Sequence, residues 1–173
     1  MKSLTLLRHA KSGWDERIAR DFDRPLNAKG RRAARAIGAA MAREGLAFDR
    51  VVASPALRVS QTIDEAETGF GGSLGARYDE RLYLAPLATL IEIVHEAAGE
   101  RLLIVGHNPG LEQLALELAD DGPERDAIAI KYPTGTLVEI ELPVAKWADA
   151  EQGAIVRMVR PRDLDPGLGP EGE

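Results

Sequence analysis

The sequence of 173 residues contains no cysteine. It therefore forms no disulfide, offers no thiolate to a metal ion and has no cysteine nucleophile. Long hydrophobic runs are also missing. The apolar stretch over residues 4–7 ends at Arg8, which is far too short for a membrane-spanning helix or a signal peptide. We therefore expect a cytoplasmic protein with no membrane partner.

Positive charge is in short supply as well. The chain has 22 lysines and arginines against 28 acidic residues, for a formal net charge of −6. A nucleic-acid-binding protein needs a basic face, so we expect no nucleic-acid partner. With 45% hydrophobic and 29% charged residues, the composition is that of an ordinary soluble globular protein, and the length suits one domain with its own core.

The C-terminal segment differs in composition from the rest. Residues 161–173 contain three prolines and three glycines and almost no apolar side chains. Such a segment buries too little surface to offset the entropy lost on ordering. We therefore expect a single domain over residues 1–160, followed by a flexible tail over residues 161–173.

Apolar runs and amphipathic stretches alternate along the chain. Three short runs have the pattern of strands covered on both faces: residues 4–7, 51–53 and 102–105. Three stretches repeat apolar residues at helical spacing: residues 28–44, 87–98 and 111–118. This alternation predicts a three-layer α/β/α sandwich with a mostly parallel sheet. Residues 136–142 and 154–159 are later strand candidates that can pair as an antiparallel edge.

Residues suited to binding phosphate follow each of the three predicted strands. Arg8 and His9 follow the first strand, a Ser-Pro pair at 54–55 follows the second, and His107 follows the third. Because ligands bind beyond the carboxyl ends of parallel strands, we expect these residues to meet at one site. Each residue alone could be a solvated side chain at a strand end or a helix cap. Their occurrence together at one edge of the sheet favours a functional site.

Two of these segments also resemble helix starts. Ser54 precedes Pro55, and Asn108 precedes Pro109, which is typical of a capping side chain before a proline in the first helical position. The free N–H groups and positive dipole end of such helices bind anions. Arg58 would lie in the first turn, where its guanidinium could fork onto phosphate oxygens. We therefore predict an anion site at this edge.

Four motifs resemble blocks of the histidine phosphatase superfamily, which has a phosphoglycerate-mutase-like fold. They are Leu-Leu-Arg-His-Ala at 6–10, Pro-Leu-Asn-Ala-Lys-Gly at 25–30, Ser-Pro-Ala-Leu-Arg-Val-Ser-Gln-Thr at 54–62 and Val-Gly-His-Asn at 105–108. Ala10 stands where most members have glycine, and we expect the pocket to tolerate its methyl group if φ stays negative. The short length and the Arg-His-Ala-Lys-Ser opening most resemble SixA-type phosphohistidine phosphatases.

The resemblance implies a catalytic role for four of these residues. His9 would be the nucleophile and would form a phosphohistidine enzyme intermediate. Arg8, Arg58 and His107 would hold the phosphoryl oxygens and offset their charge. No metal or other cofactor is implied, because the cations are side chains. The partner would be a protein that bears phosphohistidine, or a small phosphorylated substrate.

The remaining site residues are assigned on less evidence. Ser12 would add a hydroxyl to the rim of the pocket, and Asn108 would bind substrate from its helix start. Family members with alcohol leaving groups use a glutamate as proton donor, and Glu80 is our candidate, with Asp15 and Asp23 as alternatives. Phosphohistidine demands less of an acid, because its leaving group is an imidazole.

Other functions stay open at this stage. Mutases of this fold carry long insertions over the site, whereas only about 20 residues separate Thr62 from Tyr83 here, and the glycines at 69–75 make that stretch loop-like. A segment this short would leave the site open to water, which favours hydrolysis over a mutase reaction. A small-molecule phosphoesterase and a non-catalytic phosphate-binding module remain alternatives. A metal site built from His9, His107 and a carboxylate is disfavoured by the two arginines at the same edge.

Overall fold

The computed structural model describes residues 1–15 and 17–169. Its centre is a six-stranded sheet with the order β3-β2-β4-β1-β5-β6. The strands are β1 (Lys2–Arg8), β2 (Arg50–Ala53), β3 (Ala76–Tyr78), β4 (Arg101–Gly106), β5 (Leu137–Leu142) and β6 (Ala154–Val159). The first four strands pair in parallel, whereas β5 is antiparallel to both β1 and β6. The predicted α/β class, with a mostly parallel sheet and an antiparallel edge, is confirmed.

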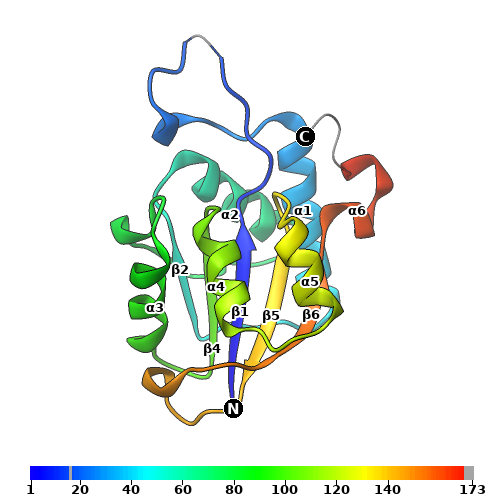
Figure 1. Ribbon diagram of the computed structural model, residues 1–173. Helices are drawn as coiled ribbons and strands as arrows, with labels where there is room; N and C mark the ends of the chain where they lie inside the picture. Colours follow the sequence, from blue (N-terminus) through cyan, green and yellow to red (C-terminus); the bar gives the residue numbers. More distant parts are fainter. Residues whose placement is uncertain (16, 170–173) are drawn as a thin grey trace.

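Helices cover both faces of this sheet. In Figure 1, α3, α4 and α5 lie in front of the sheet, and α1 and α2 lie behind it. The helices are α1 (Ala28–Arg43), α2 (Leu57–Phe70), α3 (Leu87–His95), α4 (Gly110–Leu118), α5 (Pro123–Ile130) and α6 (Pro161–Leu164). None of the helices in the described part of the chain is both long enough and apolar enough to cross a bilayer.

The two large apolar clusters of the core lie on opposite faces of the sheet. Leu4 and Leu6 of β1 pack in the cluster beneath α3, α4 and α5, whereas Leu7 packs in the cluster beneath α1 and α2. Successive residues of a strand point to opposite faces. Because both faces of the sheet are buried here, the sequences of β1 and β4 are nearly continuous apolar runs.

Helices α1 and α2 pack closely through glycine. A Cβ atom on Gly69 would lie 2.0 Å from the carbonyl oxygen of Arg35, so only glycine permits this approach. The expectation of a loop over residues 69–75 is therefore wrong at its start, because α2 continues to Phe70 and ends at Gly71 with a φ of 85°. The strand β3, which follows, was not predicted because it has only three residues.

The C-terminal segment has regular structure where a flexible tail was expected. Residues 161–168 form α6 and a 3-10 turn, η4 (Pro166–Leu168). Pro161 is buried, and Leu164 packs against the cluster beneath α1 and α2. The few apolar residues of this segment are thus enough to attach it to α1, which corrects the expectation for 161–169. The end of the expected tail, residues 170–173, lies outside the described residues.

A long loop between β1 and α1 rises above the carboxyl edge of the sheet (Figure 1). It contains a short 3-10 helix, η1 (Asp21–Asp23). The base of the loop is closed by backbone hydrogen bonds, including the amide of Asn27 to the carbonyl of Lys11 at 3.0 Å. Asn27 also caps α1 by accepting a hydrogen bond from the amide of Gly30 at 2.8 Å. The loop therefore stands beside the strand ends on a fixed base.

Candidate active site

The carboxyl ends of β2, β4 and β1 are neighbours in the sheet, and a cavity of about 370 Å³ opens beside them. It is lined by Arg8, His9, Lys11, Ser12, Asp21, Arg24, Arg58, Leu84, His107, Asn108 and Thr134. Six of the seven site residues predicted from the sequence are in this set. The exception is Glu80, which lies in the 3-10 helix η2 (Glu80–Leu82) with an exposed side chain.

The ring of His9 is held in one orientation by the backbone. Its Nδ1 lies 2.7 Å from the carbonyl oxygen of Ala10. A carbonyl only accepts hydrogen bonds, so Nδ1 carries the proton and Nε2 keeps its lone pair. Burial, together with the charges of His107, Arg58 and Arg8, lowers the pKa of His9 to about 3 against the opposing effect of that hydrogen bond. His9 is therefore neutral at physiological pH.

Ala10 fits the place where the family resemblance has glycine. It is fully buried, and its amide donates to Oγ1 of Thr62 at 3.0 Å. Among the described residues other than glycine, Leu84 alone has a positive φ. The condition set for tolerating the extra methyl group, a negative φ at residue 10, is therefore met.

Arg58 lies at the centre of the polar contacts. Its side chain is only 3% exposed. Its Nε donates to Nε2 of His9 at 3.3 Å, and its Nη2 donates to Nδ1 of His107 at 3.3 Å. Toward the loop, Nη1 donates to the carbonyl oxygen of Asp21 at 2.8 Å and Nη2 to its carboxylate at 2.9 Å. One guanidinium thus connects both histidines to the loop above the site.

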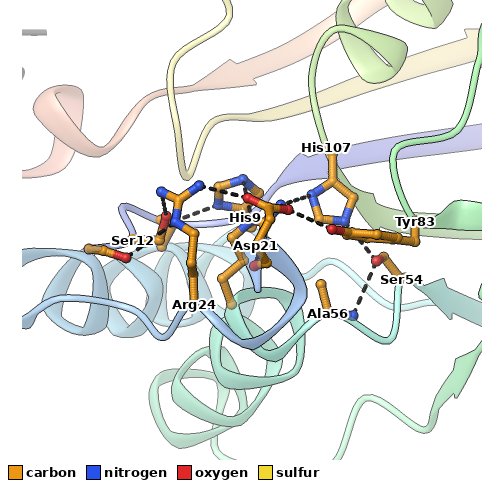
Figure 2. Close-up of polar contacts among 11 residues, drawn as sticks. His9, Ser12, Asp21, Arg24, Ser54, Ala56, Tyr83 and His107 are labelled. Carbon is orange, nitrogen blue, oxygen red and sulfur yellow. Dashed lines mark hydrogen bonds and ion pairs between the residues drawn. The ribbon is translucent and has the colours of Figure 1, made fainter. Parts of the chain in front are cut away.

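His107 faces His9 across the cavity, with 5.4 Å between the ring centroids. Because its Nδ1 accepts from Arg58, its Nε2 carries the proton and donates to Oγ of Ser54 at 2.7 Å. Figure 2 shows the hydroxyl of Ser54 between His107 and the amide of Ala56. Burial, reinforced by the charge of Arg58, lowers the pKa of His107 to about 4.

Arg8 and Asn108 are fixed by one backbone carbonyl. Nη1 of Arg8 and Nδ2 of Asn108 both donate to the carbonyl oxygen of Tyr132, at 2.9 and 3.1 Å. Tyr132 is itself buried, and its hydroxyl donates to the carbonyl of Leu6 at 2.8 Å. The segment after α5 therefore holds one side of the cavity in place.

Comparison with known proteins identifies the family. The family model of the histidine phosphatase superfamily (branch 1) matches residues 4–83. An uncharacterised protein of Mycobacterium tuberculosis is 38% identical over 153 residues, which are 85% of this chain and 93% of that protein. An uncharacterised protein of Mycobacterium leprae is 33% identical over 84% of this chain and 92% of its own. The chain belongs to the histidine phosphatase superfamily.

Solved structures of SixA proteins resemble this histidine phosphatase fold. A candidate phosphohistidine phosphatase SixA from Nakamurella multipartitia has a TM-score of 0.77 and 29% identity, covering 92% of this chain and 96% of that chain. A protein histidine phosphatase SixA complexed with tungstate has a TM-score of 0.74 over 94% and 99% of the two chains. At 21% identity, this second similarity concerns the fold. Family and neighbours together support phosphatase activity.

Both predicted helix starts of this histidine phosphatase domain need correction. Helix α2 begins at Leu57 with Ala56 as its N-cap, so Pro55 precedes the helix and is not in its first turn. Helix α4 begins at Gly110, after a cis peptide bond between Asn108 and Pro109. Arg58 nevertheless lies in the first turn of α2, and both helices start at the edge that carries the cavity.

The polar residues that the sequence analysis did not single out as candidates include Asp21, Arg24 and Tyr83. Ser54 was expected at this edge as part of the Ser-Pro pair and as a helix cap, but its hydrogen bond with His107 was not predicted. Asp21 and Arg24 lie in a loop rich in alternating charges, where no spacing distinguishes them from solvated residues. Tyr83 served only to mark the end of the short stretch after Thr62, and a lone tyrosine there carries no signal for chemistry.

The two alternative proton donors lie away from the cavity. Asp15 pairs with Arg17, and Asp23 pairs with Arg20, and neither aspartate lines the cavity. Over residues 1–15 and 17–169, no group of three histidine, aspartate or glutamate side chains is arranged to hold one metal ion. His95, at the end of α3, is exposed.

The two buried histidines make the folded state sensitive to acid. Each pKa falls from an ordinary 6.5, to about 3 for His9 and about 4 for His107. Below pH 6.5 the unfolded chain therefore binds protons that the folded chain does not, and the free energy of unfolding falls as the pH decreases toward 4. The free energy of unfolding changes by at most about 1.4 kcal/mol per pH unit for each histidine.

We expect His9→Gln to make the free energy of unfolding less dependent on pH, as measured by urea unfolding at pH 7 and pH 4.5. An equal dependence in both proteins would show that His9 titrates normally in the fold.

Proposed function

We propose that this protein is a phosphatase that takes the phosphoryl group onto Nε2 of His9 and that its substrate is phosphohistidine on a protein. The observation that carries the proposal is the orientation of the His9 ring, whose Nδ1–H is bound to the carbonyl of Ala10. The nitrogen with the lone pair is therefore the one next to Arg58. A neutral, oriented imidazole beside fixed cations is suited to nucleophilic attack on phosphorus.

In the proposed reaction, the lone pair of His9 Nε2 attacks phosphorus as the bond from phosphorus to the leaving group breaks. The leaving nitrogen takes the electron pair of that bond and departs as imidazole. Arg8, Arg58 and His107 would hold the three phosphoryl oxygens and offset their charge in the transition state. Water then attacks phosphorus, the bond to Nε2 breaks with its electron pair returning to Nε2, and the protons of the water leave with the phosphate. We propose no metal in either step, because side chains supply the positive charge.

The preference for phosphohistidine is supported by the lack of a carboxylic acid in the cavity. Asp21 is the one carboxylate that lines it within the described part of the chain. Partial burial opposes ionisation, but hydrogen bonds from Tyr83, Arg24 and Arg58 hold the pKa of Asp21 well below its ordinary value. An ionised carboxylate has no proton to give to an alkoxide leaving group. An imidazole that leaves from phosphohistidine can carry its own proton, so this cavity suits a P–N bond better than an alkyl ester.

The short connection between α2 and Tyr83 favours hydrolysis over phosphoryl transfer to a second substrate. It consists of a glycine turn, the three residues of β3 and η2. It contains no inserted helix that could cover the cavity and keep water from a phosphorylated His9. Such a cavity is also reachable by a side chain presented on a protein surface.

The test of this function is a substrate panel assayed in the presence of EDTA. We expect kcat/KM for a protein bearing phosphohistidine to exceed that for alkyl phosphates by at least about 10²-fold, the usual contribution of general acid catalysis. The value for p-nitrophenyl phosphate should lie between them, because p-nitrophenolate leaves without a proton. Glu80→Gln should leave all three values close to those of the wild type, since Glu80 lies outside the cavity.

Three outcomes would contradict parts of this proposal. Efficient hydrolysis of alkyl phosphates would identify a small-molecule phosphoesterase and imply a proton donor. A fall in kcat/KM of Glu80→Gln that is confined to alkyl phosphates would identify Glu80 as that donor. Loss of activity in EDTA with recovery on adding a divalent metal would require a metal in the reaction.

A further inference from the structure

The guanidinium of Arg58 has two hydrogen-bonding edges with different partners. The side edge, formed by Nε and Nη2, faces His9 and His107 at 3.3 Å each. The end edge, formed by Nη1 and Nη2, is bound by Asp21 through its backbone carbonyl at 2.8 Å and its carboxylate at 2.9 Å. Asp21 therefore contacts the edge that is turned away from the two histidines.

Asp21 is itself held from two sides. The hydroxyl of Tyr83 donates to Oδ2 at 2.6 Å, and Nη1 of Arg24 donates to Oδ1 at 3.0 Å. Figure 2 shows the carboxylate of Asp21 between these two side chains. Arg24 also donates to Oγ of Ser12 at 2.7 Å, which ties it to the other arm of the loop. The carboxylate thus has a fixed position rather than that of a surface ion pair.

Burial makes this contact consequential for Arg58. The arginine side chain is 3% exposed, whereas that of Asp21 is 38% exposed. A long buried side chain has several rotamers, and a guanidinium holds a phosphoryl group well only when its plane and edge are aligned. With its end edge bound to Asp21, Arg58 has a single direction in which to present its side edge.

We infer that Asp21 is a positioning residue, which binds the end edge of Arg58 so that the side edge is presented to the phosphoryl group. This inference rests on the proposed function, because it requires Arg58 to bind phosphate. Asp21 does not touch the phosphoryl group in this role. It acts through Arg58, with Tyr83 and Arg24 keeping its carboxylate in place.

A double-mutant cycle tests this inference. We expect Asp21→Ala to lower kcat for p-nitrophenyl phosphate by about 10²-fold, a loss typical of a misplaced catalytic group. In the Arg58→Ala background the same substitution should change kcat by less than about 2-fold, because the residue through which it acts is gone. Asp21→Asn keeps the size of the side chain and one acceptor oxygen, so its kcat should fall less than that of Asp21→Ala. This graded loss distinguishes a positioning role from a folding defect.

The cycle is repeated with inorganic phosphate as ligand, using calorimetry, so that it does not depend on turnover. Asp21→Ala should weaken phosphate binding in the wild-type background and leave it unchanged beside Arg58→Ala. The matched control is Asp23→Ala, since Asp23 lies in the same 3-10 helix but pairs with Arg20 at 3.0 Å and does not line the cavity. It should retain wild-type kcat and phosphate affinity.

Two results would overturn the inference. Equal losses from Asp21→Ala in both backgrounds would mean that Asp21 acts on the substrate or on the loop rather than through Arg58. Tighter phosphate binding in Asp21→Asn would mean that Asp21 competes with phosphate for Arg58. A wild type that turns over no phosphorylated substrate would instead defeat the proposed function, while the phosphate-binding cycle would still decide the role of Asp21.

Discussion

Replacing His9 with alanine should abolish turnover of every phosphorylated substrate. In enzymes that work through a covalent intermediate, loss of the nucleophile costs on the order of 10⁶-fold in kcat. The fold should survive, because His9 lines the cavity and belongs to neither apolar cluster beneath the helices. The measurement is kcat on the best substrate of the wild type, together with a thermal melt of both proteins.

The same prediction has a chemical signature. Wild-type protein quenched during turnover should carry a phosphoryl group that is labile in acid and stable in base, as expected of a phosphoramidate, and His9→Ala should carry none. The matched control is His95→Ala, because His95 is exposed at the end of α3 and lies outside the cavity. It should keep full activity and full labelling. An acid-stable adduct, or retained activity in His9→Ala, would assign the nucleophile to another residue.

Replacing Arg58 with alanine should have the next largest effect. Removal of one positioned donor to a transition state costs ~10²–10³-fold in kcat, and Arg58 has donors directed at both histidines. Asp21 would still be bound by Tyr83 and Arg24, so no carboxylate is left without a partner. We therefore expect a loss in kcat/KM that exceeds any loss in stability.

Arg58→Lys distinguishes the shape of the guanidinium from its charge. A lysine ammonium is a point charge and cannot bind Asp21 with one edge while presenting a second edge to phosphate. We expect Arg58→Lys to recover little of the activity lost in Arg58→Ala. Arg17→Ala serves as the control, because Arg17 is 91% exposed and pairs only with the exposed Asp15 among the ion pairs of the described residues. Wild-type rates in Arg58→Lys would show that charge alone suffices.

The strand ends of the site were predictable from the sequence. Arg8, His9 and His107 directly follow apolar runs, and the carboxyl ends of parallel strands lie together whatever the details of the helices between them. Arg58 was predictable because it lies within the first turn of the next helix. Helix α2 begins at Leu57, two residues later than predicted. Arg58 still lies in its first turn, because only three residues separate it from Ser54.

The contributions of the loop could not be predicted in the same way. Asp21 and Arg24 lie in a segment with no hydrophobic period, so the sequence does not indicate which of its charged residues turn inward. Their positions depend on contacts with Arg58 and Tyr83, which come from distant parts of the chain. Glu80 was misplaced for a related reason. The family resemblance implies a glutamate donor, but the conformation of η2 leaves the Glu80 side chain outside the cavity.

The hydrogen bond between Nδ1 of His9 and the carbonyl of Ala10 has a consequence for how this protein can change by mutation. The acceptor belongs to the main chain, so no single substitution at residue 10 deletes it. Many hydrolases orient a catalytic histidine with a carboxylate, and one base change can remove that carboxylate. Here the tautomer of His9 is set by the carbonyl of Ala10 and by Nε of Arg58, which donates to Nε2. Exchange of glycine for alanine at residue 10 therefore leaves the proton arrangement proposed for His9 unchanged.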